Sequence, residues 1–159
     1  MIDYEKYRPA VAKGVSNYVG VPVIRGNQSA PAPPYPYLMY NITTPAGKND
    51  GTWQQHDDGI DRLMVKSIWS ITSISDDYDQ SVTNAMKARE WIMHVGRAAL
   101  SAQGITVQSV TEINNRDNVL TVEYERKNGF DVVFYVYDAV SNPTTGIIDN
   151  VGVAHDMKA

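Results

Sequence analysis

The sequence predicts an α+β fold in which two α-helices pack on a mostly antiparallel β-sheet. Apolar residues recur at helical spacing in residues 3–19 and again in residues 77–102. Runs rich in β-branched and aromatic residues lie between and after these two segments, bounded by Gly, Pro, Asn and Asp. A chain of 159 residues fits one domain with one core. We therefore assign residues 1–159 to a single domain, with residues 141–159 as a C-terminal extension.

The first helix is expected over residues 3–19. Asp3 is a suitable N-cap, and Gly20 is a typical helix end. Pro9 falls on the outer face, where a bend can be tolerated. One side of the helix is predicted to be apolar and to face the core, and it consists of Tyr4, Tyr7, Val11, Val15 and Tyr18.

The next segments are expected to alternate between strand and loop. Residues 21–25 and 35–43 are rich in strand formers, and Pro36 suits only a strand start or an edge. Residues 26–34 (GNQSAPAPP) read as a linker. Residues 45–59 (PAGKNDGTWQQHDDG) are polar and aperiodic, which predicts a projecting loop of unusual length for a compact domain.

A central strand and a long helix follow. Residues 61–74 are rich in β-formers with apolar residues on both faces, so we expect a central strand that is covered on both sides. Asp77 with Gln80 three positions later resembles a capping box, and Gly104 is a suitable stop. The sequence thus predicts a helix from about Asp77 to Ala102.

This long helix has more apolar surface than one sheet can cover. Its apolar arc is roughly 220° wide, which exceeds the stripe of an ordinary surface helix. The helix is therefore expected to contact the sheet and, in addition, either the first helix or a neighbouring subunit. Candidate interface residues on it are Met86, Trp91 and Met93.

Three more strands are predicted after the long helix. The Asn128-Gly129 pair is a strong hairpin signal, so residues 127–129 are expected to form a turn. Residues 114–117 are expected to form another turn. The predicted strands cover residues 105–113, 118–126 and 130–138, and a last strand is predicted within the extension, at residues 147–153.

Composition excludes several classes of function. The chain has no cysteine, which removes disulfides, thiolate metal sites and cysteine nucleophiles. Its formal net charge of −4 and the lack of clustered Lys and Arg argue against a nucleic-acid grip. No apolar run reaches the ~18 residues of a membrane span, and the N-terminus does not resemble a secretion signal. We expect no membrane partner.

No residue pattern assembles a convincing catalytic or metal site, so no enzyme, cofactor or metal is predicted. His56-Asp57-Asp58 with Asp61 could ligate a divalent cation, but near-consecutive residues rarely converge on one ion. The carboxylates within residues 76–79 are explained by helix capping. His94 lies on a polar helix stripe without a nucleophile. A metal-assisted enzyme at His56 and Asp57 remains an open alternative.

Trp53 is a large aromatic residue within an otherwise polar loop. It either folds back onto the core or anchors a protein interface, where Trp is enriched. We include Trp53, Gln54 and His56 among the candidate interface residues. A second hypothesis follows from this loop: residues 47–59 bind a host or surface target, with Trp53 as the anchor.

Several stretches resemble the phage neck terminator proteins, the tail-terminator-like family of tailed bacteriophages. The opening Ile2-Asp3-Tyr4 through Gly20-Val21-Pro22-Val23-Ile24-Arg25 is similar to that family's first helix and strand. The run Pro33-Pro34-Tyr35-Pro36-Tyr37-Leu38-Met39-Tyr40 resembles its proline-aromatic entry into the second strand. Trp69 through Asp76-Asp77 to Ala88-Arg89-Glu90-Trp91 resembles its long strand, acidic turn and long helix. The resemblance covers residues 2–140.

The resemblance implies a single tail-terminator-like domain with a structural role in the virion neck, assembled in the host cytoplasm. It implies a homo-oligomeric ring, expected to be a hexamer, that closes the tail tube and lets DNA pass without specific binding. The implied partners are further copies of the chain, the major tail tube protein and a head-completion or connector protein. A neighbouring head-closure ring is an alternative that the sequence leaves open.

Overall fold

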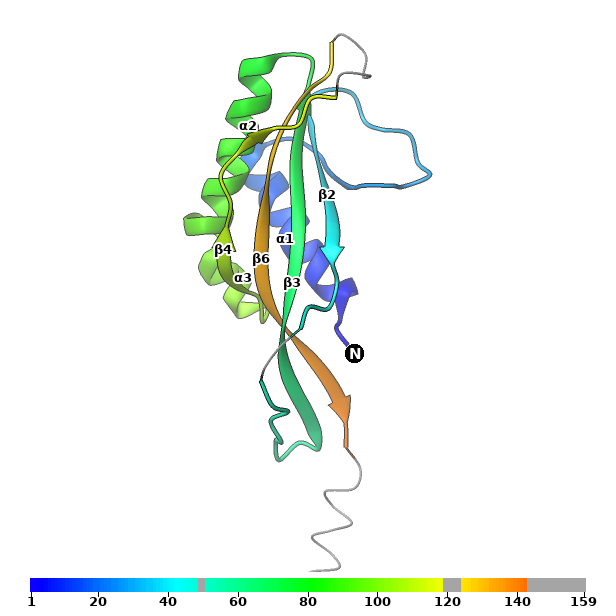
Figure 1. The fold of residues 1–159 in the computed structure, drawn as a ribbon, viewed down its shortest axis with the longest axis vertical. Coiled ribbons are helices and arrows are strands. Elements are labelled where there is room, and N and C mark those ends of the chain that lie inside the picture. Colours follow the sequence, from blue (N-terminus) through cyan, green and yellow to red (C-terminus); the bar gives the residue numbers. More distant parts are fainter. Residues whose placement is uncertain (49–50, 119–123, 143–159) are drawn as a thin grey trace, which may run out of the picture.

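A computed structural model describes residues 1–48, 51–118 and 124–142, and these form an elongated α+β fold (Figure 1). Within them, a mixed sheet has the order β1-β2-β3-β6-β4, and β5 also pairs with β6. Its strands are β1 Val23–Arg25, β2 Tyr37–Thr44, β3 Ile60–Ser75, β4 Thr106–Val110, β5 Asn114–Asn115 and β6 Arg126–Ser141. The helical segments are α1 Tyr4–Val19, α2 Tyr78–Glu90, the π-helical turn η1 Trp91–Val95 and α3 Arg97–Ala102.

The sheet is built around β3 and β6, which pair along their whole length from Ile60↔Ser141 to Ser75↔Arg126. The β1–β2 pair is parallel and the other pairs are antiparallel, so the predicted fold class is confirmed. Neither β2 nor β4 reaches the lower part of this pair. The lowest pairing of β2 is Thr44 with Ile68 of β3, and that of β4 is Thr106 with Tyr135 of β6. Residues 60–65 and 136–141 therefore continue below the sheet as a two-stranded ribbon (Figure 1).

The first helix begins and ends as the sequence predicts. The Asp3 carboxylate accepts a hydrogen bond from the Lys6 N–H at 3.2 Å, and Gly20 ends the helix in the left-handed region at φ 85°. Its buried residues are Tyr7, Val11, Val15 and Val19. Tyr18 is 39% exposed, because its hydroxyl donates to the Glu90 carboxylate instead of packing in the core.

The long helix covers the predicted range but is not continuous. Asp77 caps α2 by accepting from the Gln80 N–H at 2.9 Å. The Gln80 side chain accepts from the Ser75 hydroxyl at 2.7 Å, so it does not complete the capping box with the Asp77 N–H. The π-helical turn η1 then interrupts the α-helix between Glu90 and Arg97.

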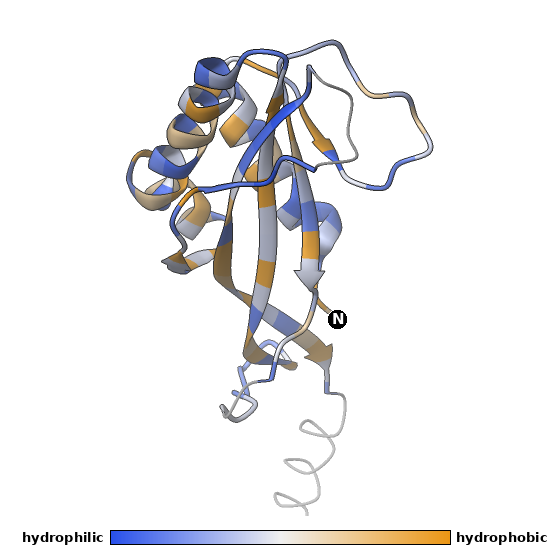
Figure 2. Ribbon diagram, turned by 45° about the horizontal axis from the view of Figure 1, so that its top comes forward, coloured by the Kyte–Doolittle hydropathy of each residue, from blue (hydrophilic) through white to orange (hydrophobic). Residues whose placement is uncertain are grey.

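The core lies between the sheet and the helices, which pack on the same face. Trp69 is at its centre, with ring centroids 5.2 Å from Tyr40 and 5.5 Å from Phe134. Burial in the middle of β3 alternates, and Figure 2 shows the matching alternation of hydrophobic and hydrophilic residues along the strands. The prediction that β3 is covered on both sides is wrong for this central part. Ile68 and Ser70 point to the opposite face, where the described residues place no helix.

The predicted turn at residues 127–129 is wrong, because these residues lie inside β6 and pair with β3. Asn128 is buried and donates to the Ser81 hydroxyl at 3.1 Å. A Cβ on Gly129 would lie 2.5 Å from the Ile71 carbonyl oxygen. The Asn-Gly pair therefore allows close packing within the sheet and does not form a hairpin turn. Part of the second predicted turn, Asn114–Asn115, is strand β5.

The predicted strand at residues 118–126 is not supported where the structure describes it. Tyr124 lies in a turn, and only Arg126 belongs to a strand, which is β6. Residues 119–123, and the strand predicted at residues 147–153, lie outside the described residues.

Candidate assembly surface

An apolar groove runs along the outer face of α2 and η1. Its volume is about 730 Å³. Met86 and Met93 in its wall are 57% and 40% exposed, although both belong to the apolar arc predicted from the sequence. The inner side of that arc is buried through Ala85, Ala88 and Ile92. The groove is lined by Thr83, Met86, Lys87, Arg89, Glu90, Met93, His94 and Ile113.

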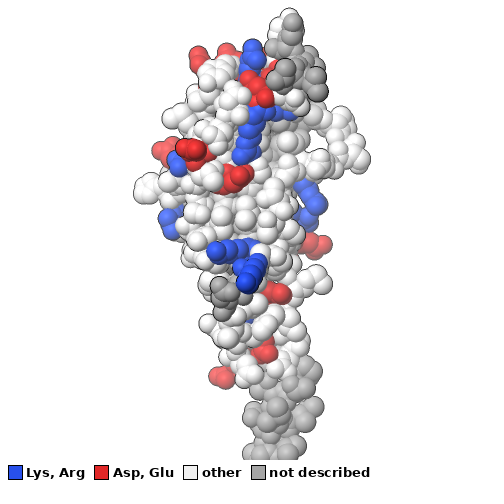
Figure 3. Space-filling model, in the orientation of Figure 1, with Lys and Arg blue, Asp and Glu red and all other residues white. Residues whose placement is uncertain are grey.

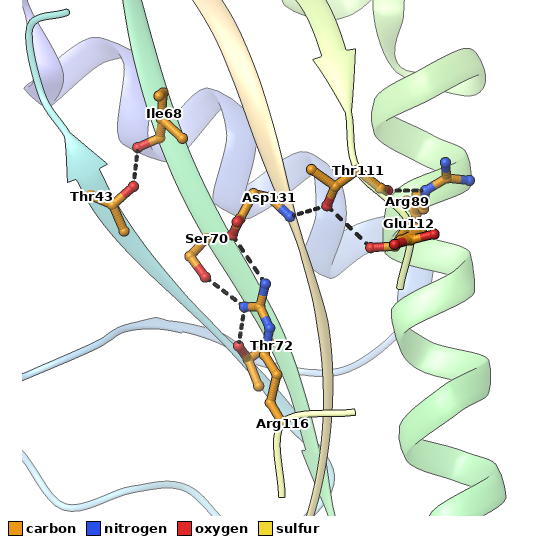
Figure 4. A network of polar contacts seen from close by, with 9 residues as sticks. All are labelled: Thr43, Ile68, Ser70, Thr72, Arg89, Thr111, Glu112, Arg116 and Asp131. Carbon is orange, nitrogen blue, oxygen red and sulfur yellow. Dashed lines mark hydrogen bonds and ion pairs between the residues drawn. The ribbon is translucent and has the colours of Figure 1, made fainter. Parts of the chain in front are cut away.

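Thr111 fixes the wall of this groove that lies opposite α2. Its backbone N–H donates to the Asp131 carbonyl at 2.9 Å, and its hydroxyl accepts from the Asp131 N–H at 2.8 Å. The Thr111 carbonyl accepts from the Arg89 Nε at 2.8 Å (Figure 4). The segment that carries Ile113 is therefore joined both to β6 and to α2.

Arg116 holds the next part of this segment against the open face of the sheet. Its Nη1 donates to the Ser70 hydroxyl at 2.6 Å and to the Thr72 hydroxyl at 3.0 Å (Figure 4). Its Nη2 pairs with the Asp131 carboxylate at 3.0 Å. Gly129 lies beside the guanidinium, and a Cβ there would approach Nη1 to 2.9 Å. These contacts to β3 and β6 make the groove a preformed surface.

At the rim of the groove, Lys87 has no ion-pair partner among the described residues, whereas Arg89 and Glu90 are already hydrogen-bonded. Glu90 accepts the Tyr18 O–H at 3.0 Å, and this hydrogen bond raises the pKa of Tyr18. Lys87 is exposed, and none of the ion pairs among the described residues involves it. His94 is exposed at the same rim. An acidic partner would meet Lys87 first.

Trp91, the third candidate on this helix, is buried within the protomer. Its side chain is only 8% exposed and lies against α1. A Cβ added to Gly14 of α1 would lie 2.2 Å from the Trp91 ring, and so would one added to Gly96. The ring therefore fills the gap between α1 and the long helix, and it is not part of the accessible groove.

The loop candidates lie at the lower end of the ribbon (Figure 1). The Gln54 N–H donates to the Arg62 carbonyl at 2.8 Å, and the Arg62 N–H returns a bond of 2.9 Å. The Asp58 carboxylate pairs with the Arg62 guanidinium at 2.9 Å. The hydrogen bond from Arg62 is the main reason why the pKa of Asp58 lies below its usual value. These contacts attach the loop to β3.

Trp53 on this loop is 43% exposed, so its side chain is neither buried in the core nor fully surrounded by solvent. The described residues provide no hydrogen-bond acceptor for its indole N–H. Trp residues with one apolar face and a free N–H are frequent in interfaces. Gln54 and His56 beside it are exposed.

The described residues contain no group of three or more His, Asp or Glu side chains placed to hold a metal ion. His56 and Asp57 are exposed on the loop, and Asp58 is engaged by Arg62. A second hollow of about 860 Å³ lies between residues 26–30 and β2, and its only charged lining residue is Arg25. On the face shown in Figure 3, acidic and basic side chains are scattered between large uncharged areas. Among the described helices, none is long and apolar enough to cross a membrane.

Sequence reasoning identified the helix side of the groove but missed the other side. Met86 and Met93 were expected from the apolar arc. Thr111, Ile113 and Arg116 were not, because their roles depend on contacts with residues far away in the chain. The Asn128-Gly129 pair marked a position with special backbone or packing requirements, but as a local motif it predicted a turn.

One of three comparisons with known proteins identifies a family. A family model described as phage neck terminator protein matches residues 10–156. One solved structure aligns over 90% of this chain and 99% of its own, with 16% sequence identity and a TM-score of 0.43. No curated protein matches the sequence significantly.

Proposed function

Because the chain belongs to the phage neck terminator protein family, we propose that it forms a ring that ends the tail tube and joins it to the head-completion proteins. Membership of the family makes the chain a structural protein of the phage neck, associated with other tail and head proteins. The ring, its expected sixfold symmetry and the passage of DNA through its lumen are parts of the proposal. So are its contacts with the major tail tube protein and with a head-side connector.

The observation that carries the proposal is the exposed methionine-lined groove beside α2. Apolar patches that remain exposed on a folded monomer commonly mark protein–protein contacts. Full burial of a methionine side chain contributes roughly 1.5–3 kcal/mol. Met86 and Met93 are 57% and 40% exposed, so an isolated chain lacks part of this contribution, and a neighbouring subunit would supply it.

Ring formation suits a surface of this kind. Identical subunits that contact through two different surfaces form closed rings when the rotation between them closes. A ring also multiplies several weak contacts into stable attachment at the end of a tube. A head-closure ring next to the tail terminator would form through the same kind of subunit contact. The two roles are therefore distinguished by which partner the chain binds.

The test is light scattering and sedimentation of the purified chain, alone and with isolated tail tubes. The unmodified chain is expected to form rings or to bind tube ends, and a double variant with Met86→Glu and Met93→Glu is expected to lose at least about tenfold in affinity, equivalent to about 1.4 kcal/mol. The single variants Met86→Glu and Met93→Glu are measured as well, and Asn17→Glu, which adds the same single negative charge at an exposed position of α1, is their control. An unmodified chain that stays monomeric and never associates with tubes would contradict the proposal. Binding to an isolated connector but not to tubes would instead favour the head-closure position.

A further inference from the structure

Two apolar surfaces are exposed within the described part of the chain, and they differ in shape. One is Trp53, a half-exposed aromatic residue on the loop at the lower end of the ribbon. The other is the α2 groove, a preformed hollow with two exposed methionines. We propose that Trp53 of one protomer inserts into the α2 groove of the next copy in the ring. This inference rests on the proposed function and specifies its subunit contact.

The chemistry of the two surfaces is complementary. Met86, Met93 and Ile113 give the groove a flexible apolar lining. Methionine side chains adapt their shape to a partner, and their sulfur makes favourable contacts with aromatic rings. The indole N–H of Trp53 would meet polar acceptors at the rim, where the Glu90 carboxylate and the Thr83 hydroxyl lie. An aromatic residue in a pocket is also the usual centre of an interface.

The charges around the two surfaces are opposite. On the same loop as Trp53, Asp57 is exposed and has no ion pair among the described residues, whereas Asp58 is paired with Arg62. At the groove, Lys87 is exposed and equally unpaired within the described part of the chain. Complementary charge at an interface rim mainly directs the partners into register. Insertion of Trp53 would bring Asp57 toward Lys87.

The positions of the two surfaces fit a contact that repeats around a ring. The loop lies at the bottom of the elongated molecule and α2 lies along its upper part (Figure 1). A contact between two different surfaces leaves one of each free on every dimer, so further copies can add, and a ring results when the rotation between copies closes. The ribbon supplies the reach, because β3 and β6 stay paired along residues 60–65 and 136–141.

Disulfide trapping tests this contact, because the native chain contains no cysteine. Gln54→Cys labels the loop beside Trp53, and Thr83→Cys labels the groove; both native side chains are exposed. The two single variants are mixed on tail tubes under mild oxidation. We expect covalent dimers of one variant with the other, and few dimers when either variant is used alone. Asn17→Cys replaces Thr83→Cys in the control mixture.

The outcomes separate this inference from the proposed function. Mixed dimers at least tenfold above the control, lost when Trp53→Ala is added to the Gln54→Cys chain, would support the insertion. Tube-end assembly without mixed dimers, and with unchanged assembly of Trp53→Ala, would overturn the insertion but leave the ring intact. An unmodified chain that never binds tube ends would overturn both. Circular dichroism of each variant checks that the fold is retained.

Discussion

Gly129 occupies a position in β6 that has no room for a side chain. A Cβ would lie 2.5 Å from the Ile71 carbonyl oxygen and 2.9 Å from the Arg116 Nη1. Because the first of these atoms belongs to the backbone of β3, the strand pair itself would have to move. We predict that Gly129→Ala lowers the free energy of unfolding by about 1–3 kcal/mol, which is the usual cost of overpacking. Urea denaturation followed by circular dichroism measures this change.

The control for Gly129→Ala is Gln108→Ala, at an exposed position of the edge strand β4. Its free energy of unfolding should stay within about 0.5 kcal/mol of the native value, as for most surface substitutions. Equal stability of Gly129→Ala and the native chain would show that the strands adjust without cost and would contradict the prediction.

Asp58 gives a prediction about pH. Hydrogen bonds from Arg62 hold the pKa of its carboxyl below the usual value of 3.8. A lowered pKa means that the ion pair stabilises the folded loop above the usual pKa and that this contribution is lost as the pH falls through the lower, folded-state value. We predict that a carboxyl NMR titration finds more than half of Asp58 ionised at pH 3.8 and that Arg62→Gln moves its pKa back toward 3.8. An unchanged titration of Asp58 in Arg62→Gln would show that another group lowers the pKa.

At the scale of elements, the packing of α1 against the long helix depends on Trp91. The ring fills the space that Gly14 and Gly96 leave open, and its side chain is nearly buried. We predict that Trp91→Ala costs about 3–5 kcal/mol of stability, the range for removal of a large buried aromatic residue. Met93→Ala is the matched control two positions away, with a side chain that is 40% exposed. Thermal and urea denaturation of both variants measures the difference.

The comparison of Trp91 and Met93 also separates core from interface. If Trp91→Ala folds as well as Met93→Ala but fails to assemble, the assignment of Trp91 to the core is wrong. The sequence could not make this distinction, because both residues lie on the same wide apolar arc. The small residue at position 14 that receives the ring belongs to another helix, and its contact is visible only in the fold.

Elements with local signals were predictable, and elements with distant causes were not. The Asp3 cap and Gly20 end bound α1, and the Asp77 cap opens α2, because capping uses neighbouring residues. The start of β6 was missed, because the roles of Asn128 and Gly129 depend on residues far away in the chain. Asn128 donates a hydrogen bond to Ser81, and Gly129 packs against the Ile71 carbonyl. Of the groove, the helix side followed from periodicity, while the wall with Ile113 depends on tertiary hydrogen bonds.

At the scale of the whole molecule, all helices that the structure describes lie on one face of the sheet, and the described residues place no helix on the other face. The sequence predicted cover on both sides because apolar residues such as Ile68 alternate with core residues such as Trp69. In the structure, Ile68 is half-buried opposite Val133 of β6, with Ser70 two positions along and Arg116 bonded to that serine. The surface that remains is mixed in character, and it carries no continuous basic strip on the face shown in Figure 3.

The net charge of the whole chain predicts weak contact with DNA. Affinity for duplex DNA comes largely from basic side chains that displace counterions from phosphates, and non-specific binders reach dissociation constants of roughly 10⁻⁴–10⁻⁶ M at physiological salt. A chain with a formal charge of −4 lacks the excess of positive charge for such contacts. We predict no saturable binding to a fluorescent duplex below about 10⁻⁴ M in fluorescence anisotropy at physiological salt, both for the free chain and for the chain assembled on tail tubes. Micromolar binding that weakens steeply as salt is raised would reveal a basic surface created by assembly, and the proposed lumen would then grip DNA and not simply let it pass.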